Sequence, residues 1–398
     1  MEVVTGASES DMSHHPAGLA EWIAEALQCA PSHIEIELIA GDASPRRYYR
    51  VTLSDGSAKM VLGGEAREMP SCIAMVSPAS ENNEAFLSVG AQLAKAGVRA
   101  PAVWTQSLER GWFLLEDFGD QQLLAVLASH RDSAAPLYQK AFDALECQIS
   151  LPIERADVPH YDAERLKTEL EVFPEWFLSG LLGIQPDERL RRCFAALTDY
   201  LISTFTEQPT VWVHRDFHSR NLMLLGSNQL GVIDFQDAVL GPITYDPVSL
   251  LKDCYIRWPR TQQLEWLDGY LVRLKSVEVG ATSVDVSAPS AKASRLQALA
   301  IQLDEVSTAQ FQRWFDLTGL QRHLRVLGVF ARLHLRDRKS SYLTNLPLVT
   351  EYVREALVLA ADTHGSVAEF SGWFEADLMK VIRKQSWYES IDPEGWVR

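Results

Sequence analysis

The stretch that decides the fold is VHRDFHSRNL (213–222), which is followed by VIDFQ (232–236). The apolar run at 211–213 leads into it and predicts a short strand. Two further apolar pieces, 221–225 and 231–235, flank the polar turn Ser227-Asn228-Gln229 and predict a hairpin. Because Asn221 would begin one strand and Asp234 would end its partner, we expect these two side chains to lie next to each other.

The order of polar residues in this stretch indicates a type of chemistry. His214, Asp216 and Asn221 fit the pattern H-R-D-x-x-x-x-N, and Asp234 follows on a short apolar strand, an order typical of phosphoryl transfer from ATP. Asp216 would orient the acceptor hydroxyl and take its proton. Asn221 and Asp234 would supply hard oxygen ligands for the Mg²⁺ that accompanies a triphosphate.

Two neighbours of Asp216 could assist this transfer. His218 and Arg220 are close enough in sequence to offset charge developing on the phosphoryl group, and a structural or solvated role is equally open for each. His214 and His218 could instead be zinc ligands at positions i and i+4. That geometry needs a helix and usually a glutamate between the histidines, whereas a strand precedes them here. We therefore interpret His214 as a buried residue that braces the loop.

The chain upstream of this stretch predicts a small lobe that contains most of the strands. After a polar tail (1–17), residues 18–118 contain a short helix, strands and one longer helix that ends at Gly97. Ile34, Ile36 and Leu38 alternate with glutamates, as in a half-exposed strand. The turn Asp55-Gly56 predicts that the strand at 48–53 continues into a third strand at 58–62. Two more strands are expected around 102–104 and 112–116.

Residues 119–398 predict a larger, mainly helical lobe. Apolar residues recur at helical spacing in four segments, 162–173, 187–205, 316–336 and 348–361. Residues 277–294 are small and turn-rich, which predicts a surface insertion. The fold class expected from this order is α+β, with two lobes.

Composition excludes several classes of protein. The net charge is −16, which disfavours binding to nucleic acid or anionic lipid. No uncharged apolar run approaches the ~18 residues of a membrane helix, and no secretory leader is visible, so we expect a cytoplasmic protein, without a membrane or nucleic-acid partner and monomeric. Five scattered cysteines argue against a disulfide framework and against a cysteine zinc site.

The motifs and the two-lobe order resemble the aminoglycoside-phosphotransferase superfamily of small-molecule kinases, which has a protein-kinase-like fold. More narrowly, GDASPRRYYRV (41–51), LKTELEVFPEWFL (166–178), FQDAVLGPITYD (235–246) and FDLTGLQRHL (315–324) resemble the bacterial anomeric kinases of N-acetylmuramate and N-acetylglucosamine. The resemblance implies an ATP- and Mg²⁺-dependent enzyme that phosphorylates the C1 hydroxyl of an amino sugar in cell-wall recycling. It also implies that Asp246 braces the catalytic loop, although a helix N-cap would explain this residue nearly as well.

The resemblance also suggests nucleotide-binding residues in the smaller lobe. The hairpin from Gly41 to Arg50 would cover the phosphates, with Ser44 and either Arg46 or Arg47 in contact with them, although these arginines could simply be solvated. The strand lysine usual in kinases is absent near Gly63, and Lys59, with Glu84 as its partner, is the candidate to replace it. Glu116, at the end of the last strand, is a further candidate.

Small-molecule phosphorylation is favoured over protein phosphorylation, because no APE motif follows Asp234 and Gln236 replaces the glycine of DFG. Five residues are candidate contacts for sugar hydroxyls: Glu169, Glu171, Trp176, Gln236 and Asp237. For Trp176 a plain core role is the stronger alternative, and for the others a solvated or structural role is equally open. Two other functions remain open, an aminoglycoside kinase and a nucleotide-binding pseudokinase that acts as a scaffold.

Overall fold

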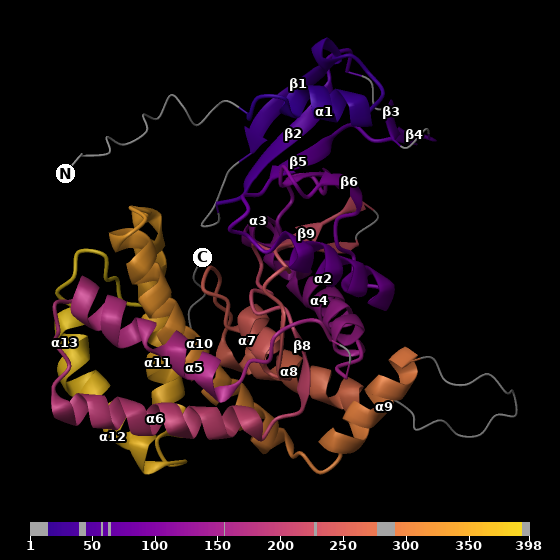
Figure 1. Ribbon diagram of the computed structural model, residues 1–398. Helices are drawn as coiled ribbons and strands as arrows, with labels where there is room; N and C mark the ends of the chain where they lie inside the picture. The colour runs from indigo at the N-terminus through magenta and orange to yellow at the C-terminus, as the bar shows by residue number, and fades with distance from the viewer. Residues whose placement is uncertain are drawn as a thin grey trace, which may run out of the picture. The chain divides into compact units, whose positions relative to one another are not determined.

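The computed structural model describes residues 15–39, 45–56, 59–62, 65–154, 156–226, 229–276 and 291–391. The chain divides into two compact units (Figure 1). The first comprises residues 1–90 and 100–119, and the second comprises residues 91–99 and 120–398. An antiparallel sheet forms the first unit and helices dominate the second, which confirms the predicted α+β, kinase-like fold.

The first unit is built on a five-stranded antiparallel sheet in the order β1-β2-β5-β7-β6. Its apolar face is covered by α1 (Leu19–Ala26), whose Leu19 and Ile23 pack against Tyr49 and Val51 of the sheet. A short 3₁₀ turn, η2 (Pro31–His33), leads into the first strand, and α2 (Asn83–Ala96) runs from the first unit into the second. The strands are β1 (Ile34–Ile39), β2 (Arg47–Leu53), β5 (Cys72–Val76), β6 (Val103–Ser107) and β7 (Trp112–Glu116).

The third strand of this sheet was predicted wrongly. Residues 58–62 were expected to continue the meander, but β3 (Lys59–Leu62) pairs with β4 (Glu65–Glu68) in a separate hairpin. In the five-stranded sheet, β2 pairs with β5, in which Cys72 and Ala74 are fully buried. A short strand buried on both faces shows no alternation of apolar and polar residues, so periodicity alone does not reveal it.

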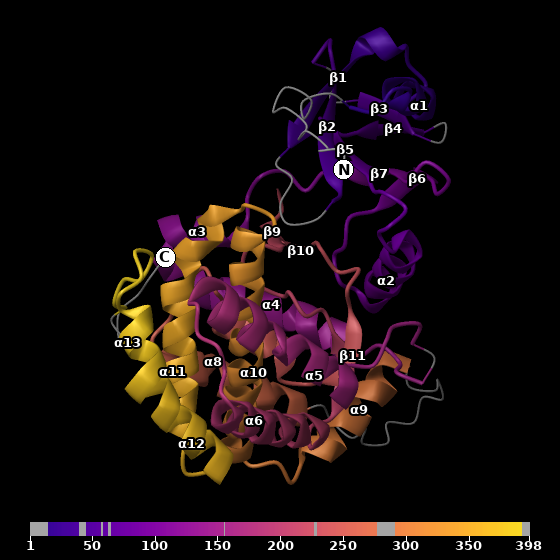
Figure 2. The same ribbon diagram turned by 60° about the vertical axis from the view of Figure 1, so that its left-hand side comes forward.

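The core of the second unit surrounds the long helix α10 (Thr308–Leu335), which packs against α11 (Leu346–Ala360), α6 (Glu188–Thr206) and the π-helical segment η4 (Phe173–Leu181) (Figure 2). Gly328 lets α10 approach the backbone just before η4 closely, because a Cβ at this position would lie 2.4 Å from the carbonyl oxygen of Val172. The remaining helices are α3 (Leu123–Ser129), η3 (Arg131–Ser133), α4 (Ala134–Ile149), α5 (Ala163–Leu170), α7 (Tyr245–Leu251), α8 (Arg260–Lys275), α9 (Ala291–Leu303), η6 (Ser340–Asn345), α12 (Gly365–Trp373), η7 (Phe374–Leu378) and α13 (Met379–Ile382).

The four helices predicted in this unit are confirmed as α5, α6, α10 and α11. α10 begins at Thr308, earlier than expected, because the Ser307 side chain accepts a hydrogen bond from the Gln310 amide at 3.1 Å and caps the helix. In the predicted insertion, residues 277–290 lie outside the described residues. Residues 291–294 were expected to belong to the turn-rich segment but begin α9, because Ala and Lys favour helix.

Two small two-stranded sheets carry the central sequence stretch. The predicted hairpin is confirmed as β9 (Leu222–Leu224) with β10 (Leu230–Val232). β8 (Thr210–Val213) pairs with β11 (Val239–Pro242), a strand that was not predicted. The loop between β8 and β9 is therefore anchored by a two-stranded sheet at each end.

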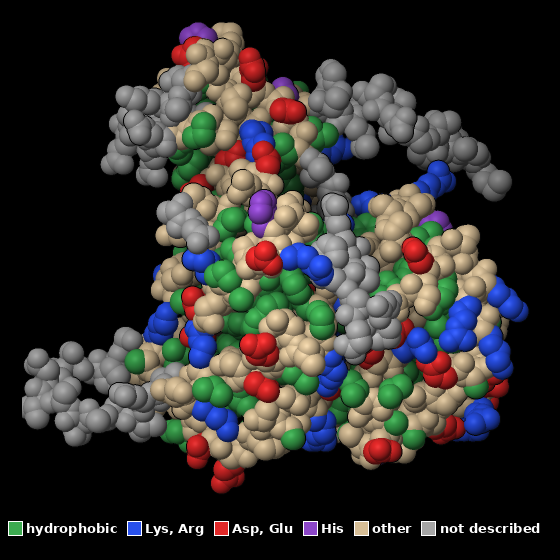
Figure 3. Space-filling model, turned by 180° about the vertical axis from the view of Figure 1, so that it is seen from behind, with side chains coloured by type: hydrophobic (Ala, Val, Ile, Leu, Met, Phe, Trp, Pro, Cys, Tyr) green, Lys and Arg blue, Asp and Glu red, His purple; other side chains and the backbone are tan. Residues whose placement is uncertain are grey.

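The surface agrees with the acidic, mixed composition. Figure 3 shows acidic, basic and hydrophobic side chains interspersed on the face that it presents. Within the described ranges, no helix combines the length and the apolar character needed to cross a bilayer.

Candidate functional site

The loop from His214 to Asn221 is fixed by one buried carboxylate. Asp246, in the first turn of α7, accepts hydrogen bonds from the backbone amides of His214 at 2.7 Å and Arg215 at 2.9 Å. Its Oδ2 also accepts from Gln148 Nε2 at 2.6 Å. Burial raises the pKa of Asp246, and the three hydrogen bonds act in the opposite direction by stabilising the ionised form. Asp246 therefore braces the loop and does not act as a helix cap.

Other contacts fix the loop on both sides. Arg215 has a φ of 78°, in the left-handed region that side chains rarely adopt. Its carbonyl accepts a hydrogen bond from Ser249 Oγ at 2.9 Å. Further along the loop, the amide and hydroxyl of Ser219 both donate to Asp253 Oδ2, at 2.9 and 2.5 Å. His214 is buried and its Nε2 lies 3.1 Å from the Ile233 carbonyl, consistent with a structural role.

The structure brings together the side chains that sequence predicted as metal ligands. Asn221 Nδ2 lies 3.0 Å from the Asp216 carbonyl oxygen and 3.3 Å from Asp234 Oδ2. Gln236 donates to Asp234 Oδ1 at 2.9 Å, whereas Asp237 is exposed. An amide and an exposed carboxylate are oxygen donors of the kind that Mg²⁺ prefers, so this pair fits the ion. Within the part of the chain that the structure describes, no group of three or more His, Cys, Asp or Glu is placed to hold a metal.

Asp216 faces a group of cations. Arg322 Nη2, from α10, lies 3.9 Å from Asp216 Oδ1, and the Arg322 side chain is only 2% exposed against 35% for Asp216. Burial alone would raise the pKa of Asp216. The charges of Arg325, His218, Arg322 and Arg215 outweigh that effect and lower the pKa to about 2. Asp216 is therefore fully ionised at neutral pH.

Glu169, a predicted sugar contact, is held by arginines. Its carboxylate accepts from Arg215 Nη2 at 2.5 Å and pairs with Arg325 Nε at 2.9 Å and Arg165 Nε at 3.5 Å. The Tyr161 hydroxyl also donates to it. Burial would raise the pKa of Glu169, but Arg325 and Arg215 lower it. Glu169 thus links α5 to the catalytic loop and to α10, and its contact with a sugar remains a prediction.

His218 and Arg220 contact the same aromatic ring. The Arg220 guanidinium lies 3.7 Å from the centre of the Tyr255 ring, and the His218 ring meets Tyr255 edge-on at 5.3 Å. Burial lowers the pKa of His218, although Asp253 and Asp216 oppose that shift. The two carboxylates therefore offset part of the effect of burial on the His218 pKa.

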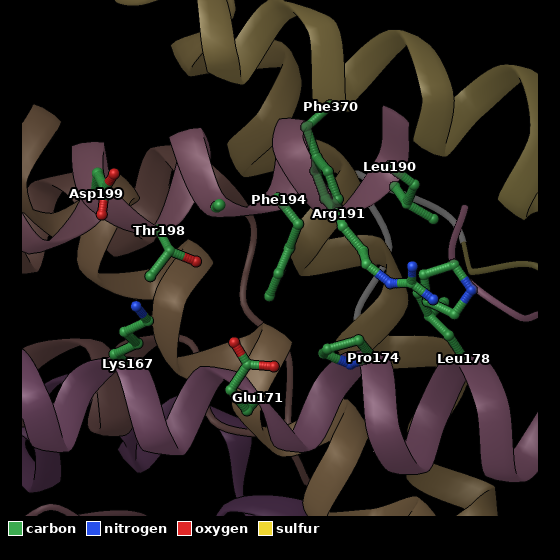
Figure 4. A pocket seen from close by; sticks show the side chains of 12 residues that line it. Lys167, Glu171, Pro174, Leu178, Leu190, Arg191, Phe194, Thr198, Asp199 and Phe370 are labelled. Atoms are coloured by element: carbon green, nitrogen blue, oxygen red, sulfur yellow. The ribbon is translucent and has the colours of Figure 1, made fainter. Parts of the chain in front are cut away.

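Two predicted sugar contacts lie elsewhere on the second unit. Glu171 is exposed and lines a pocket between α5, η4 and α6, together with Lys167, Arg191 and Asp199 (Figure 4). No residue of the catalytic loop lines this pocket. Trp176 packs against the hydrophobic core of the unit. Neither residue is placed beside Asp216 by any described contact.

The candidates in the first unit are only partly described. Gly41 and Ser44 lie outside the described residues, as does the side chain of Lys59, so its pairing with the exposed Glu84 stays a prediction. Arg46 is buried, where its Nε donates to Ser77 Oγ at 3.2 Å and its Nη2 lies 3.6 Å from Glu81. Glu116 accepts from the Ala102 amide at 3.3 Å.

Sequence reasoning missed the two arginines of α10. Arg322 and Arg325 belong to the segment 316–336, whose apolar spacing predicted a helix and no site residue, and α10 does bury most of its length. The signal was present, since arginine is rarely buried in a core without a partner. A charged pair at i, i+3 inside an apolar helix indicates that the helix faces a charged group.

Comparison with known proteins identifies the family of this chain. Residues 35–282 match the model of the phosphotransferase enzyme family APH. The N-acetylmuramate/N-acetylglucosamine kinases of Pseudomonas putida and Pseudomonas aeruginosa are each 35% identical to this chain, and the matches cover 80% of this chain and 82% of each relative. The solved choline kinase of Cryptosporidium parvum has a TM-score of 0.54 at 11% identity, covering 90% of this chain and 99% of that one. This last similarity concerns the fold alone.

Proposed function

The chain belongs to the phosphotransferase enzyme family as a small-molecule kinase, and we propose that it transfers the γ-phosphoryl group of ATP to the anomeric hydroxyl of N-acetylmuramate or N-acetylglucosamine. The product would be the sugar 1-phosphate, an intermediate suited to the recycling of cell-wall sugars. The observation that carries the proposal is the position of Asp216 on a loop that Asp246 braces. The backbone carbonyl of Asp216 accepts a hydrogen bond from the side-chain amide of Asn221. Identity to kinases of these two sugars supports the choice of acceptor.

Asp216 is the proposed base. Because its pKa is about 2, it accepts a proton only after the hydroxyl has begun to lose it. The carboxylate would therefore orient the hydroxyl first and take the proton late, as suits a loose phosphoryl-transfer transition state. An anomeric hydroxyl is a favourable acceptor, since the ring oxygen withdraws charge and makes it more acidic than an ordinary alcohol.

Asn221 and Asp234 would hold the Mg²⁺ that accompanies ATP. The ion would neutralise phosphate charge when bound. Gln236 keeps the Asp234 carboxylate in place through its hydrogen bond at 2.9 Å. Asp234 itself has a φ of 64°, so the backbone there is held in a conformation that a non-glycine residue adopts only under constraint.

Several buried polar atoms around Asp216 support a polar ligand at this site. His218 Nδ1, Arg215 Nε and Arg322 Nε are buried and make no hydrogen bond to any described residue. Buried polar atoms are almost always paired in folded proteins. A substrate rich in hydroxyl and amide groups would supply the missing partners.

An aminoglycoside kinase is the alternative within the family, and the charges disfavour it. Aminoglycosides are polycations, whereas Arg215, Arg322 and Arg325 surround the proposed base. A cationic surround would repel such a substrate.

The test is ADP release by purified protein with Mg²⁺ and one of three acceptors: N-acetylmuramate, N-acetylglucosamine or kanamycin. We expect turnover with at least one of the two sugars and none with kanamycin. Asp216→Asn should lower turnover by about 10³-fold or more while nucleotide binding persists. Turnover with kanamycin alone would contradict the sugar assignment, and an Asp216→Asn protein with full biological effect would favour a scaffold.

A further inference from the structure

Positive charge gathers beside Asp216. Four arginines converge on two carboxylates, Asp216 and Glu169. The arginines are Arg165, Arg215, Arg322 and Arg325. A cluster of arginines in a chain of net charge −16 is a favourable place for an anionic ligand.

The two arginines of α10 have donors to spare. Arg322 is 2% exposed, and its one hydrogen bond within the described residues joins Nη1 to the Cys254 sulfur at 3.4 Å. Its Nε is buried without a partner. Arg325 pairs with Glu169 through Nε alone, and its two terminal nitrogens make no hydrogen bond to another described residue. The guanidinium fork of Arg325, 19% exposed, is therefore reachable by a ligand.

We propose that Arg322 and Arg325 form a subsite for a carboxylate of the substrate, so that N-acetylmuramate is preferred over N-acetylglucosamine. This inference rests on the proposed function and goes beyond it by choosing between the two sugars. N-acetylmuramate is N-acetylglucosamine that carries a lactic-acid ether, and this ether supplies the only carboxylate in either sugar. A planar guanidinium fork suits a carboxylate because it can donate two parallel hydrogen bonds.

The position of the pair on the helix supports this role. Residues three apart lie on the same face of a helix, so Arg322 and Arg325 present their charges together toward Asp216. Glu169 fixes Arg325 from α5, which leaves its terminal nitrogens oriented and without a further partner among the described residues. A substrate held by its carboxylate at this pair would have its anomeric end free to approach Asp216.

The experiment compares kcat/KM for the two sugars in the full-length protein and in Arg325→Gln. We expect N-acetylmuramate to be preferred by the unaltered protein. Arg325→Gln should lower kcat/KM for N-acetylmuramate by roughly tenfold to a hundredfold, the effect of losing a charge-assisted hydrogen bond. The loss for N-acetylglucosamine should be smaller than the loss for N-acetylmuramate by roughly tenfold or more, and Arg325→Lys should restore part of the preference.

A matched control is Arg165→Gln, since Arg165 pairs with the same Glu169 carboxylate but is 33% exposed. It should leave the ratio of the two sugars unchanged. A second measurement needs no variant: replacing the lactyl carboxylate of the substrate by its neutral amide should lower kcat/KM with the unaltered protein by a similar factor.

Equal losses for both sugars in Arg325→Gln would overturn the inference, because the arginine would then act only through Asp216 or the phosphoryl group. A preference for N-acetylglucosamine in the unaltered protein would also overturn it while leaving the proposed function intact. Turnover of neither sugar by the unaltered protein would instead count against the proposed function itself.

Discussion

The buried carboxylate of Asp246 offers the sharpest perturbation of the loop that carries Asp216. Asp246→Asn keeps the shape of the side chain but replaces one acceptor oxygen by an amino group. His214 N and Gln148 Nε2 share Oδ2, while Arg215 N uses Oδ1 alone. With the amide oxygen in the Oδ2 position, the new amino group would face the Arg215 amide, donor against donor.

The magnitude follows from this geometry. Leaving one buried amide unpaired costs about 1–3 kcal/mol, and the two remaining hydrogen bonds lose the strength that a charged acceptor gives them. Burial raises the pKa of Asp246 because it disfavours the ionised carboxylate, so the neutral Asn side chain regains part of that loss. We expect the free energy of unfolding to fall by about 2–3 kcal/mol.

The catalytic effect should be larger than the effect on stability. Arg215 is held at a φ of 78° partly by its bond to Asp246, and Asp216 is the next residue. If the loop relaxes by about 1 Å, the rate should fall by about 10²-fold. Nucleotide affinity should change little, because Asn221 and Asp234 are held by their own hairpin.

Urea unfolding and steady-state kcat would be measured on Asp246→Asn and on the control Asp362→Asn, an exposed aspartate in the turn after α11. The control should match the unaltered protein in both measurements. If Asp246→Asn kept kcat within twofold and unfolded at the same urea concentration, the proposed bracing role would be wrong.

Three further predictions concern charge, packing and metal binding. The pKa of Asp216 is about 2, below the ordinary value of 3.8, so the ionised carboxylate stabilises the fold above about pH 4. Urea unfolding should therefore show that Asp216→Asn is less stable than the unaltered protein at pH 7, and this difference should shrink as the pH falls toward 2. A variant that is more stable at pH 7 would contradict this. Gly328→Ala would place a Cβ 2.4 Å from the Val172 carbonyl oxygen, so thermal melting should show that the free energy of unfolding falls by about 2–3 kcal/mol. An unchanged melting temperature would show that α10 can shift to accommodate the methyl group. Gln236→Ala releases Asp234, so a Mg²⁺ titration of turnover should shift to concentrations about threefold to tenfold higher, whereas no shift would mean that Gln236 does not position the ligand.

The sequence predicted most of the site because a short motif joined to a hairpin determines its own local geometry. Asp216, Asn221 and Asp234 lie within one segment, and the β9–β10 pairing confirmed their expected proximity. The contribution of α10 could not be predicted in this way. Arg322 is distant in sequence from Asp216, and only tertiary packing brings them together.

The error in the sheet has a physical cause of the same kind. β5 was missed because a strand that is buried on both faces has no period-two pattern. The two predicted contacts Glu169 and Glu171 have different surroundings, because residues two apart on a helix point to different sides. Glu169 faces the arginines, while Glu171 lines the separate pocket of Figure 4.

The most direct measurement is the position of the phosphoryl group in the product. Protein, ATP, Mg²⁺ and N-acetylmuramate or N-acetylglucosamine would be incubated, and the product examined by phosphorus and proton magnetic resonance. We predict a sugar whose anomeric proton is coupled to phosphorus and whose reducing end is lost. A product that keeps its reducing end and carries phosphate on another hydroxyl, or the absence of any sugar phosphate, would contradict the account.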